Sequence, residues 1–373
     1  MRLTLNNLAY FLVDKGFLHP EYLVSGNYKV IQRQSRNSIF QVFLGNHPGG
    51  LFIKQLLSLD PQNAYLMQKD ATVHCLIQQT DILPEMRTFI PHYYGYEPDN
   101  HVFVTEFFPS AISLHELITQ RKSVVPEEIA RMAIILANLH KDLSGQIENN
   151  SGLRFFNRQP PWIMLFGDWD NPQVKNAGPS QIPIGQFIQQ RPEIAQFLED
   201  LRYAWSGNTL IHGDIKLINF IHVPGNSASE MKLIDWEIAD IGDPMWDVAG
   251  LLQSLLTLWI FSQNPNPMLQ NQSQPGMEFL TWESTLSACH TFWLSYRKSR
   301  AYAHPDQALD SAENRQKVIH FTAARMLQTA CESTIASNEI SPQSNRIVQM
   351  VMQMITAPQA WTTQILGAQS NEL

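Results

Sequence analysis

The sequence predicts an α+β fold with two lobes, a small lobe built on an antiparallel sheet (residues 1–108) and a large, mainly helical lobe (residues 109–373). Two observations support this prediction. Short apolar runs separated by turn residues fill much of the first third of the chain, whereas apolar residues recur at three- and four-residue steps in later segments. A length of 373 residues is enough for two or three lobes with ample core.

The small lobe contains a predicted leading helix and four predicted strands. The helix covers Leu5–Lys15 and ends at Gly16. The strands cover residues 28–32, 39–44, 51–56 and 101–107. Lys54 shares a face of the third strand with Phe52 and Leu56, because strand side chains alternate. A lysine among apolar neighbours is a candidate functional residue; the alternative is a solvent-facing residue at a sheet edge.

A helix between the third and fourth strands carries a second unusual residue. Asp60 and Pro61 are typical of a helix N-terminus, and the predicted helix runs to about Gln79. Asp70 falls on the same face as the apolar residues Leu66 and Val73. It is therefore an acid on an apolar stripe.

The large lobe is predicted to consist mostly of helices. They cover residues 126–143, 191–205, 278–297, 312–336 and 344–356. The most apolar stretch, Val248–Phe261, is too short and too polar to span a membrane, so it predicts a core helix. Residues 145–185 are rich in loop signals, and residues 262–276 are a low-complexity segment that predicts an exposed loop.

Composition and charge exclude several classes of protein. Hydrophobic residues make up 44% of the chain and charged residues 16%, as in globular proteins, and the net charge of −8 argues against nucleic acid as a partner. Cys75, Cys289 and Cys331 are far apart and odd in number, which favours reduced thiols over disulfides or a zinc site. Without a signal-peptide pattern, we expect a cytoplasmic protein that does not act at a membrane.

The strongest motif has the form H-x-D-x-x-x-x-N and contains His212, Asp214 and Asn219. A second acid, Asp235, follows at the end of an apolar run. This is the spacing of the catalytic loop and metal-binding Asp of kinases. The alternative is a buried histidine with turn-forming acids beside an ordinary hairpin.

Phosphoryl transfer explains why these residue types are spaced in this way, since it requires positioning and charge neutralisation more than covalent catalysis. Asp214 would orient an acceptor hydroxyl, and Lys216 would neutralise the γ-phosphate. Asn219 and Asp235 would hold Mg²⁺ through oxygen ligands.

The details of these motifs resemble the aminoglycoside phosphotransferase and choline kinase-like families. Glycine stands between His212 and Asp214, Trp236-Glu237 follows Asp235, and Gly242-Asp243-Pro244 precedes Asp247. The resemblance covers about residues 29–254. It implies a protein kinase-like fold and transfer of phosphate from ATP or GTP to a hydroxyl of a small molecule. It also implies that Asp247 braces the catalytic loop through backbone donors, and that His140 is a packing residue rather than a catalyst.

The resemblance also implies a set of nucleotide-binding residues in the small lobe. Lys54 would grip the α- and β-phosphates, with Asp70 as its partner where the family usually has Glu. Glu106 and Phe108 would meet the adenine edge through their backbones. The remaining pair, Asn37 and Ser38, ends a loop over residues 33–38 that lacks the family's usual glycine.

Two alternative functions stay open at this point. The glycine-free loop and Asp70 favour a degenerate kinase that only binds a nucleotide or a protein partner. A protein kinase is the other, although Gly213 and Trp236 argue against it. If the chain is an enzyme, we expect its acceptor site against residues 145–185 and the helices after residue 278. Some of the nine tryptophans could line that site, and the alternative is that they pack in the core.

Overall fold

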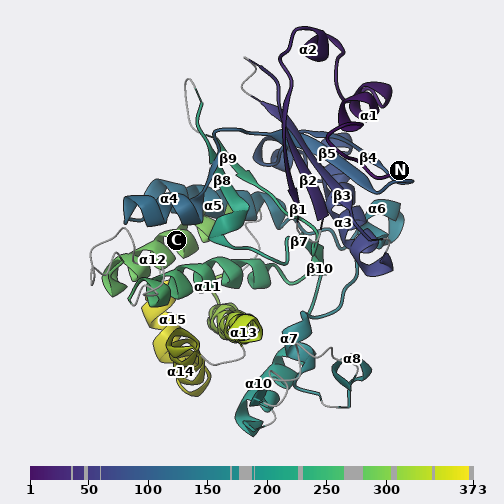
Figure 1. Cartoon of the computed structure of the whole chain (residues 1–373). Helices are drawn as coiled ribbons and strands as arrows, with labels where there is room; N and C mark the ends of the chain where they lie inside the picture. The colour runs from purple at the N-terminus through teal and green to yellow at the C-terminus, as the bar shows by residue number, and fades with distance from the viewer. Residues whose placement is uncertain are drawn as a thin grey trace. The chain divides into compact units, whose positions relative to one another are not determined.

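The computed structural model describes residues 1–34, 37–45, 49–58, 60–168, 170–175, 187–188, 190–225, 230–263, 280–303, 309–337 and 341–368. The chain divides into two compact units (Figure 1). The first unit combines Met1–Leu114 with Ile218–Ala239, and the second combines His115–Leu217 with Asp240–Leu373. A segment from the middle of the chain therefore belongs to the first unit.

The first unit is built on an antiparallel sheet of five strands in the order β1-β2-β3-β5-β4. The strands are β1 (Lys29–Gln34), β2 (Asn37–Phe43), β3 (Gly50–Leu56), β4 (Tyr93–Glu97) and β5 (Val102–Phe107). Three helices and one 3-10 turn accompany them: α1 (Leu8–Asp14), α2 (Glu21–Val24), α3 (Pro61–Gln79) and η1 (Pro84–Phe89).

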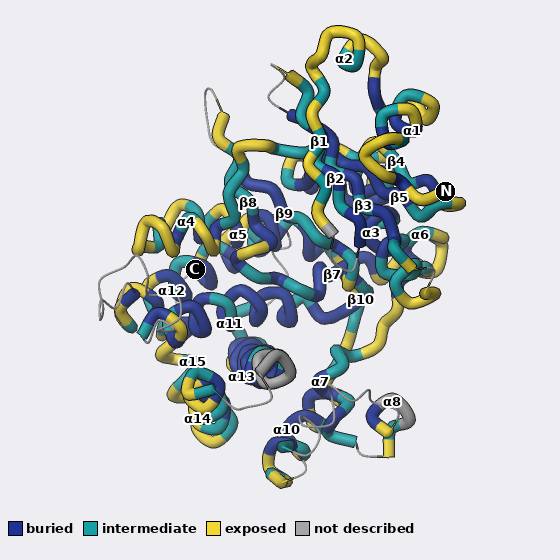
Figure 2. Tube along the Cα trace, in the orientation of Figure 1, coloured by how far each residue is buried: buried dark blue, intermediate teal, exposed yellow. Residues whose placement is uncertain are grey.

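The two faces of this sheet pack against different helices. Leu51 and Ile53 of β3 lie in a core cluster with Leu8 and Leu12 of α1. On the other face, Leu56 of β3 and Phe103 of β5 pack against Met67 and Ala71 of α3. The alternation of β3 between buried and half-buried residues follows from this arrangement (Figure 2). Lys54 lies on the face that α3 covers.

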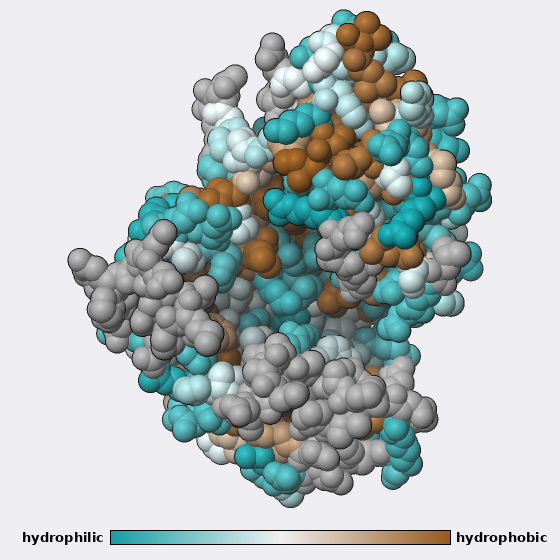
Figure 3. Space-filling view, in the orientation of Figure 1, coloured by the Kyte–Doolittle hydropathy of each residue, from teal (hydrophilic) through white to brown (hydrophobic). Residues whose placement is uncertain are grey.

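The segment from the middle of the chain adds a second, smaller sheet to the first unit. Its strands are β6 (Ile112–Ser113), β8 (Phe220–Val223) and β9 (Glu230–Leu233), in the order β6-β8-β9. In the β8–β9 hairpin, Phe220 lies opposite Leu233. This pairing places the ends of the two strands side by side. Elsewhere on this unit, apolar side chains gather at the surface near α1 and α2 (Figure 3), where Tyr10 and Val24 are exposed.

The second unit is mainly helical. Its longer helices are α4 (Leu114–Arg121), α5 (Pro126–Leu139), α10 (Pro192–Tyr203), α11 (Pro244–Ser262), α12 (Trp282–Ala303), α13 (Ala312–Ser337), α14 (Pro342–Thr356) and α15 (Pro358–Leu366). Its short elements are η2 (Ile147–Asn149), α6 (Ser151–Arg154), α7 (Trp162–Leu165), α8 (Pro172–Lys175) and the paired strands β7 (Thr209–Ile211) and β10 (Asp240–Gly242). The turn η3 (Leu217–Asn219) begins at the last residue of the stretch His115–Leu217 and continues into the segment that folds with the first unit.

Helix α11 forms the centre of the second unit. It is long and apolar enough to cross a membrane by length and composition, but 83% of its apolar window is buried inside the protein (Figure 2). The prediction of a core helix is therefore confirmed. Asp243 caps it, since its Oδ1 accepts a hydrogen bond of 2.9 Å from the Met245 N–H.

The structure corrects several predicted boundaries. The predicted helix over residues 126–143 ends at Leu139, because His140 leaves helical geometry. Asn37 and Ser38 were expected in a loop, but they lie in β2 because they pair with β3. Most of the predicted low-complexity loop, residues 264–276, lies outside the described residues, as does Trp169.

Candidate active site

Two predicted residues of the first unit meet around one ammonium group. The Lys54 Nζ lies 3.1 Å from the Asp70 Oδ2 and 3.1 Å from the Asp235 Oδ1. Strand β3 directs Lys54 towards α3, and the apolar stripe of α3 directs Asp70 towards β3. The side chain of Asp70 is 3% exposed and that of Asp235 is 39% exposed. Lys54 is therefore not the solvent-facing edge residue of the alternative interpretation.

The charges of this cluster stabilise one another. Burial alone would lower the pKa of Lys54, but the carboxylates of Asp70, Asp235 and Glu237 outweigh it and raise that pKa. Burial likewise opposes ionisation of Asp70, yet Lys54 and His74 hold the pKa of its carboxyl well below its usual range. The His74 Nδ1 lies 3.4 Å from the Asp70 Oδ1, one helical turn away.

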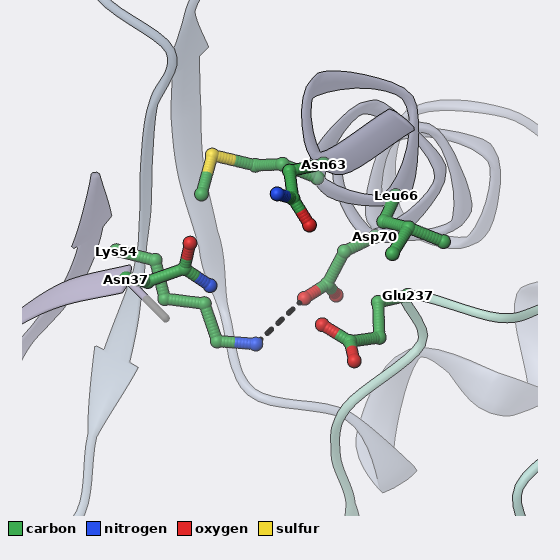
Figure 4. A pocket seen from close by; sticks show the side chains of 7 residues that line it. Asn37, Lys54, Asn63, Leu66, Asp70 and Glu237 are labelled. Atoms are coloured by element: carbon green, nitrogen blue, oxygen red, sulfur yellow. Dashed lines mark hydrogen bonds and ion pairs between the residues drawn. The ribbon is translucent and has the colours of Figure 1, made fainter. Parts of the chain in front are cut away.

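A pocket opens beside this cluster (Figure 4). It is lined by Asn37, Lys54, Asn63, Leu66, Met67, Asp70 and Glu237. Figure 4 shows the Glu237 carboxylate pointing towards the same space as that of Asp70. Glu237 is part of the motif that follows Asp235, but we predicted no role for it from the sequence. Its spacing of two residues from Asp235 was the available signal.

The two residues predicted for the phosphate loop separate in the structure. Asn37 is buried and lines the pocket beside Lys54. Ser38 is also buried, but its Oγ accepts a hydrogen bond of 3.0 Å from the Gln32 Nε2 within the β1–β2 hairpin. Ser38 is thus not among the residues that line this pocket. The loop residues 35 and 36 lie outside the described residues.

The backbones of Glu106 and Phe108, at the end of β5, could offer a ligand one hydrogen-bond acceptor and one donor. The Glu106 N–H donates a hydrogen bond of 2.8 Å to the His92 carbonyl, so Glu106 could offer a ligand only its carbonyl. The Phe108 carbonyl accepts a hydrogen bond of 3.1 Å from the Ala111 N–H, and the Phe108 N–H is the donor that this residue could offer a ligand.

The predicted metal ligands lie on neighbouring ends of the β8–β9 hairpin. The Ile234 N–H donates a hydrogen bond of 3.0 Å to the Asn219 carbonyl, which places Asn219 beside the residue that precedes Asp235. An amide and a carboxylate are oxygen donors of the kind that Mg²⁺ prefers. The described residues contain no group of three or more His, Cys, Asp or Glu side chains arranged for a metal. The donor set therefore fits a hard cation that takes further oxygens from a ligand or water.

Asp214 and Lys216 are paired in the second unit. The Lys216 Nζ lies 2.8 Å from the Asp214 Oδ1. Burial would raise the pKa of Asp214, but Arg325 and Lys216 together lower it. Asp214 is therefore an ionised carboxylate at neutral pH, with two cations beside it.

Asp247 braces the loop that carries Asp214, as the resemblance implied. This buried carboxylate accepts hydrogen bonds from the backbone N–H groups of His212 (2.7 Å) and Gly213 (2.9 Å). The His140 Nε2 lies 3.1 Å from the same carboxylate, and its Nδ1 lies 2.8 Å from the Tyr296 hydroxyl. His140 is thus a buried residue with both ring nitrogens bonded, as predicted.

Comparison with known families agrees with these motifs. Residues 97–281 match the model of the phosphotransferase enzyme family, and this range includes Asp214, Asn219 and Asp235. The resemblance inferred from the sequence is therefore confirmed.

Solved structures confirm the fold class as protein kinase-like. An ethanolamine kinase of Plasmodium vivax aligns with a TM-score of 0.56 at 13% identity, over 94% of this chain and 87% of that one. A choline kinase of Cryptosporidium parvum aligns with a TM-score of 0.56 at 14% identity, over 96% and 98%. A choline/ethanolamine kinase family protein of Mesorhizobium loti aligns with a TM-score of 0.50 at 12% identity, over 95% and 99%. The comparison with curated proteins gave no match.

Proposed function

We propose that this member of the phosphotransferase family moves the γ-phosphate of ATP to a hydroxyl group of a small molecule, with Mg²⁺. The observation that carries the proposal is the position of Lys54, whose ammonium lies 3.1 Å from both Asp70 and Asp235. Kinases bind phosphates with a lysine that is held between an acidic residue of a helix and a second acidic residue that follows a β-hairpin. A degenerate kinase that only binds a nucleotide would not need Asp214, which is retained beside Lys216 in the second unit.

The first unit would bind the nucleotide. Lys54 would contact the α- and β-phosphates, Asp70 would orient it, and Asn37 would lie beside them. The carbonyl of Glu106 and the N–H of Phe108 match the donor and acceptor on the Watson–Crick edge of adenine, whereas guanine presents the reverse order. This pattern is the reason to propose ATP rather than GTP.

Asn219 and Asp235 would hold Mg²⁺. When bound, the ion would neutralise charge on the phosphate oxygens. The protein's own contribution is to hold the Asp235 carboxylate 3.1 Å from the Lys54 Nζ and to place Asp235 next to Asn219 by the β8–β9 pairing.

The second unit would bind the acceptor and orient its hydroxyl. Asp214 would accept a hydrogen bond from that hydroxyl, and Lys216 would reach the transferred phosphate. A cavity of about 740 Å³ in this unit is lined in part by the segment 145–185, which we expect to form one wall of the acceptor site. It is lined by Asn157, Gln159, Pro160, Leu165, Asn171, Arg202 and Trp205. Such a lining, with amides and an arginine, does not favour a polycationic aminoglycoside.

The test is a nucleotide-consumption screen with ATP and GTP against amino alcohols, other hydroxylated metabolites and aminoglycosides. We expect Asp214→Ala to lower the turnover of the best acceptor about 100-fold or more while ATP still binds, because the carboxylate acts on the acceptor. Asp81→Ala serves as the control, since Asp81 is an exposed acid that pairs with Arg87 at the surface of the first unit. Turnover that persists in Asp214→Ala at the original rate would refute the assignment. Phosphorylation of generic proteins instead of small molecules would favour a protein kinase.

A further inference from the structure

A buried arginine of the second unit reaches the loop that carries Asp214 from a distant part of the sequence. Arg325 lies on α13 and is 3% exposed. Its Nη1 donates a hydrogen bond of 2.7 Å to the Gly213 carbonyl, and its Nη2 donates one of 3.0 Å to the Ile215 carbonyl. The Nη2 also lies 3.6 Å from the Asp214 Oδ1. One guanidinium therefore holds the residues on both sides of Asp214 and faces its carboxylate.

Neighbouring residues fix this guanidinium in place. It lies over the Trp246 ring at 5.1 Å, and the Trp246 Nε1 donates to the same Gly213 carbonyl at 3.2 Å. Gly250 of α11 permits the close approach, since a Cβ there would lie 2.8 Å from the Ile215 carbonyl and 3.1 Å from the Arg325 Nη2. A planar fork with fixed donors can bridge two carbonyls, which a lysine ammonium cannot do with the same geometry.

We propose that Arg325 is a positioning residue for Asp214, holding the loop 213–215 in the conformation required for phosphoryl transfer and fixing the direction of the Asp214 carboxylate. This inference rests on the proposed function, because Arg325 acts by positioning Asp214. Burying a charged guanidinium costs desolvation energy. The hydrogen bonds that offset this cost go to the loop 213–215, which indicates that the loop needs them. The sequence contained no motif for Arg325, which lies far along the chain from the loop.

The charges around Asp214 add a second expected effect. The groups that face it are Lys216 and Arg325, with the His212 ring, whose Nδ1 accepts a hydrogen bond of 3.3 Å from the Asp214 N–H, and Asp247 behind the loop. Arg325 lowers the pKa of Asp214. Removing its charge therefore raises that pKa, and the acid limb of the rate profile moves to higher pH.

The experiment compares Arg325→Met, Arg325→Lys and Arg325→Gln with Arg315→Met. Arg315 is an equally buried arginine on the same helix, but it pairs with Asp310 rather than with the loop. The readouts are kcat, the KM for MgATP, the pH profile and thermal unfolding, measured with the best acceptor from the screen and with water as acceptor. We expect Arg325→Met to lower kcat at least about 10-fold with little change in KM for MgATP, because a misplaced group loses rate rather than nucleotide affinity.

The conservative variants separate charge from geometry. Arg325→Lys should restore the pH profile without restoring all of kcat, whereas Arg325→Gln should leave the acid limb displaced. Arg315→Met should lower thermal stability and leave kcat and the pH profile unchanged. If Arg325→Met does not fold, Arg325→Lys and Arg325→Gln carry the comparison. Equal losses of kcat in Arg315→Met and the Arg325 variants would overturn the proposal.

Amide hydrogen exchange tests the same inference without any catalysed reaction. Peptides covering residues 212–217 should exchange faster in the Arg325 variants than in the wild type or in Arg315→Met. Unchanged exchange would overturn the positioning role. If instead Asp214→Ala left phosphoryl transfer intact, the proposed function would fail whatever the exchange shows, so the two failures are distinguishable.

Discussion

Asp235 has the most unusual backbone among the candidate residues. Its φ is 72°, in the left-handed region that costs most L-residues roughly 1–2 kcal/mol and that Asp and Asn enter more readily. Such strain in a residue that contacts Lys54 points to a functional requirement. The conformation keeps its carboxylate partly exposed while it contacts Lys54.

We predict that Asp235→Asn abolishes the Mg²⁺ dependence of ATP binding. Asparagine tolerates the same backbone, so the variant removes the charge and little else. The main anionic ligand is then lost, and ATP should bind with the same affinity with and without Mg²⁺. Calorimetric titration under both conditions measures this. Asp81→Asn, at an exposed surface pair, should retain the full Mg²⁺ effect; a variant at position 235 that also retains it would contradict the metal assignment.

At the residue scale, the sequence predicted those candidate residues that stand out from the periodic pattern of a single strand or helix. Strand alternation identified Lys54, and the helical stripe identified Asp70. Ser38 does not line the pocket with its neighbour Asn37, because side chains alternate with period two within β2, and a loop assignment ignores that alternation. Arg325 could not be found, since its contacts join residues more than a hundred positions apart.

At the scale of elements, long periodic helices were predicted more completely than short strands. Helix α3 was predicted with the bounds that it has, because Asp60 and Pro61 mark its start. Strand β4 and helix α4 were not predicted. β4 contains Gly95 and a register shift against β5, so its identity depends on pairing rather than on its own residues.

The start of α11 offers a direct test of an element boundary. Gly242 packs so closely that a Cβ would lie 2.4 Å from the Ile211 Cδ1, Asp243 caps the helix, and Pro244 fills its first turn. The Asp243 Oδ2 also pairs with Lys317 at 3.0 Å. This explains the Gly-Asp-Pro motif as a structural feature.

We predict that Asp243→Ala lowers the free energy of unfolding by about 0.5–2 kcal/mol, the usual range for a lost helix cap. Asp243→Asn keeps an oxygen for the Met245 N–H and loses only the ion pair, so its effect should be smaller. Urea unfolding of both variants measures the difference. Equal destabilisation would mean that the ion pair with Lys317, not the cap, stabilises this end of α11.

At the scale of the whole molecule, one buried network connects several helices of the second unit. His140 follows α5, Asp247 lies in α11 and Tyr296 lies in α12. Burial has the largest effect on His140 and lowers its pKa. Burial would raise the pKa of Asp247, but the hydrogen bonds from His140 and from the His212 N–H lower it. The folded second unit therefore holds a neutral histidine beside an ionised acid.

We predict that thermal stability falls as the pH is lowered below about 6.5, the ordinary pKa of histidine. The unfolded chain binds a proton at His140 at higher pH than the folded chain does, so acidification favours unfolding. A second loss follows below about pH 4, where the unfolded chain protonates Asp247 before the folded chain does. Melting curves from pH 8 to 3 measure both steps.

His140→Gln should reduce the first of these losses, because glutamine does not titrate. His320→Gln should reduce the same loss independently, since burial also lowers the pKa of His320, which lies against Phe197 outside the network. A slope between pH 7 and 5 that is the same in His140→Gln as in the wild type would show that His140 does not control acid stability.

The segment Ile218–Ala239 affects how such proteins can be recombined. It carries Asn219 and Asp235, yet it is encoded inside the sequence of the second unit and folds with the first. A chimera made with one crossover after Leu114 would therefore combine the lysine of one parent with the proposed metal ligands of another. Exchanging nucleotide preference between relatives requires two grafted fragments, and a gene fragment that encodes the first unit alone does not exist as one continuous stretch.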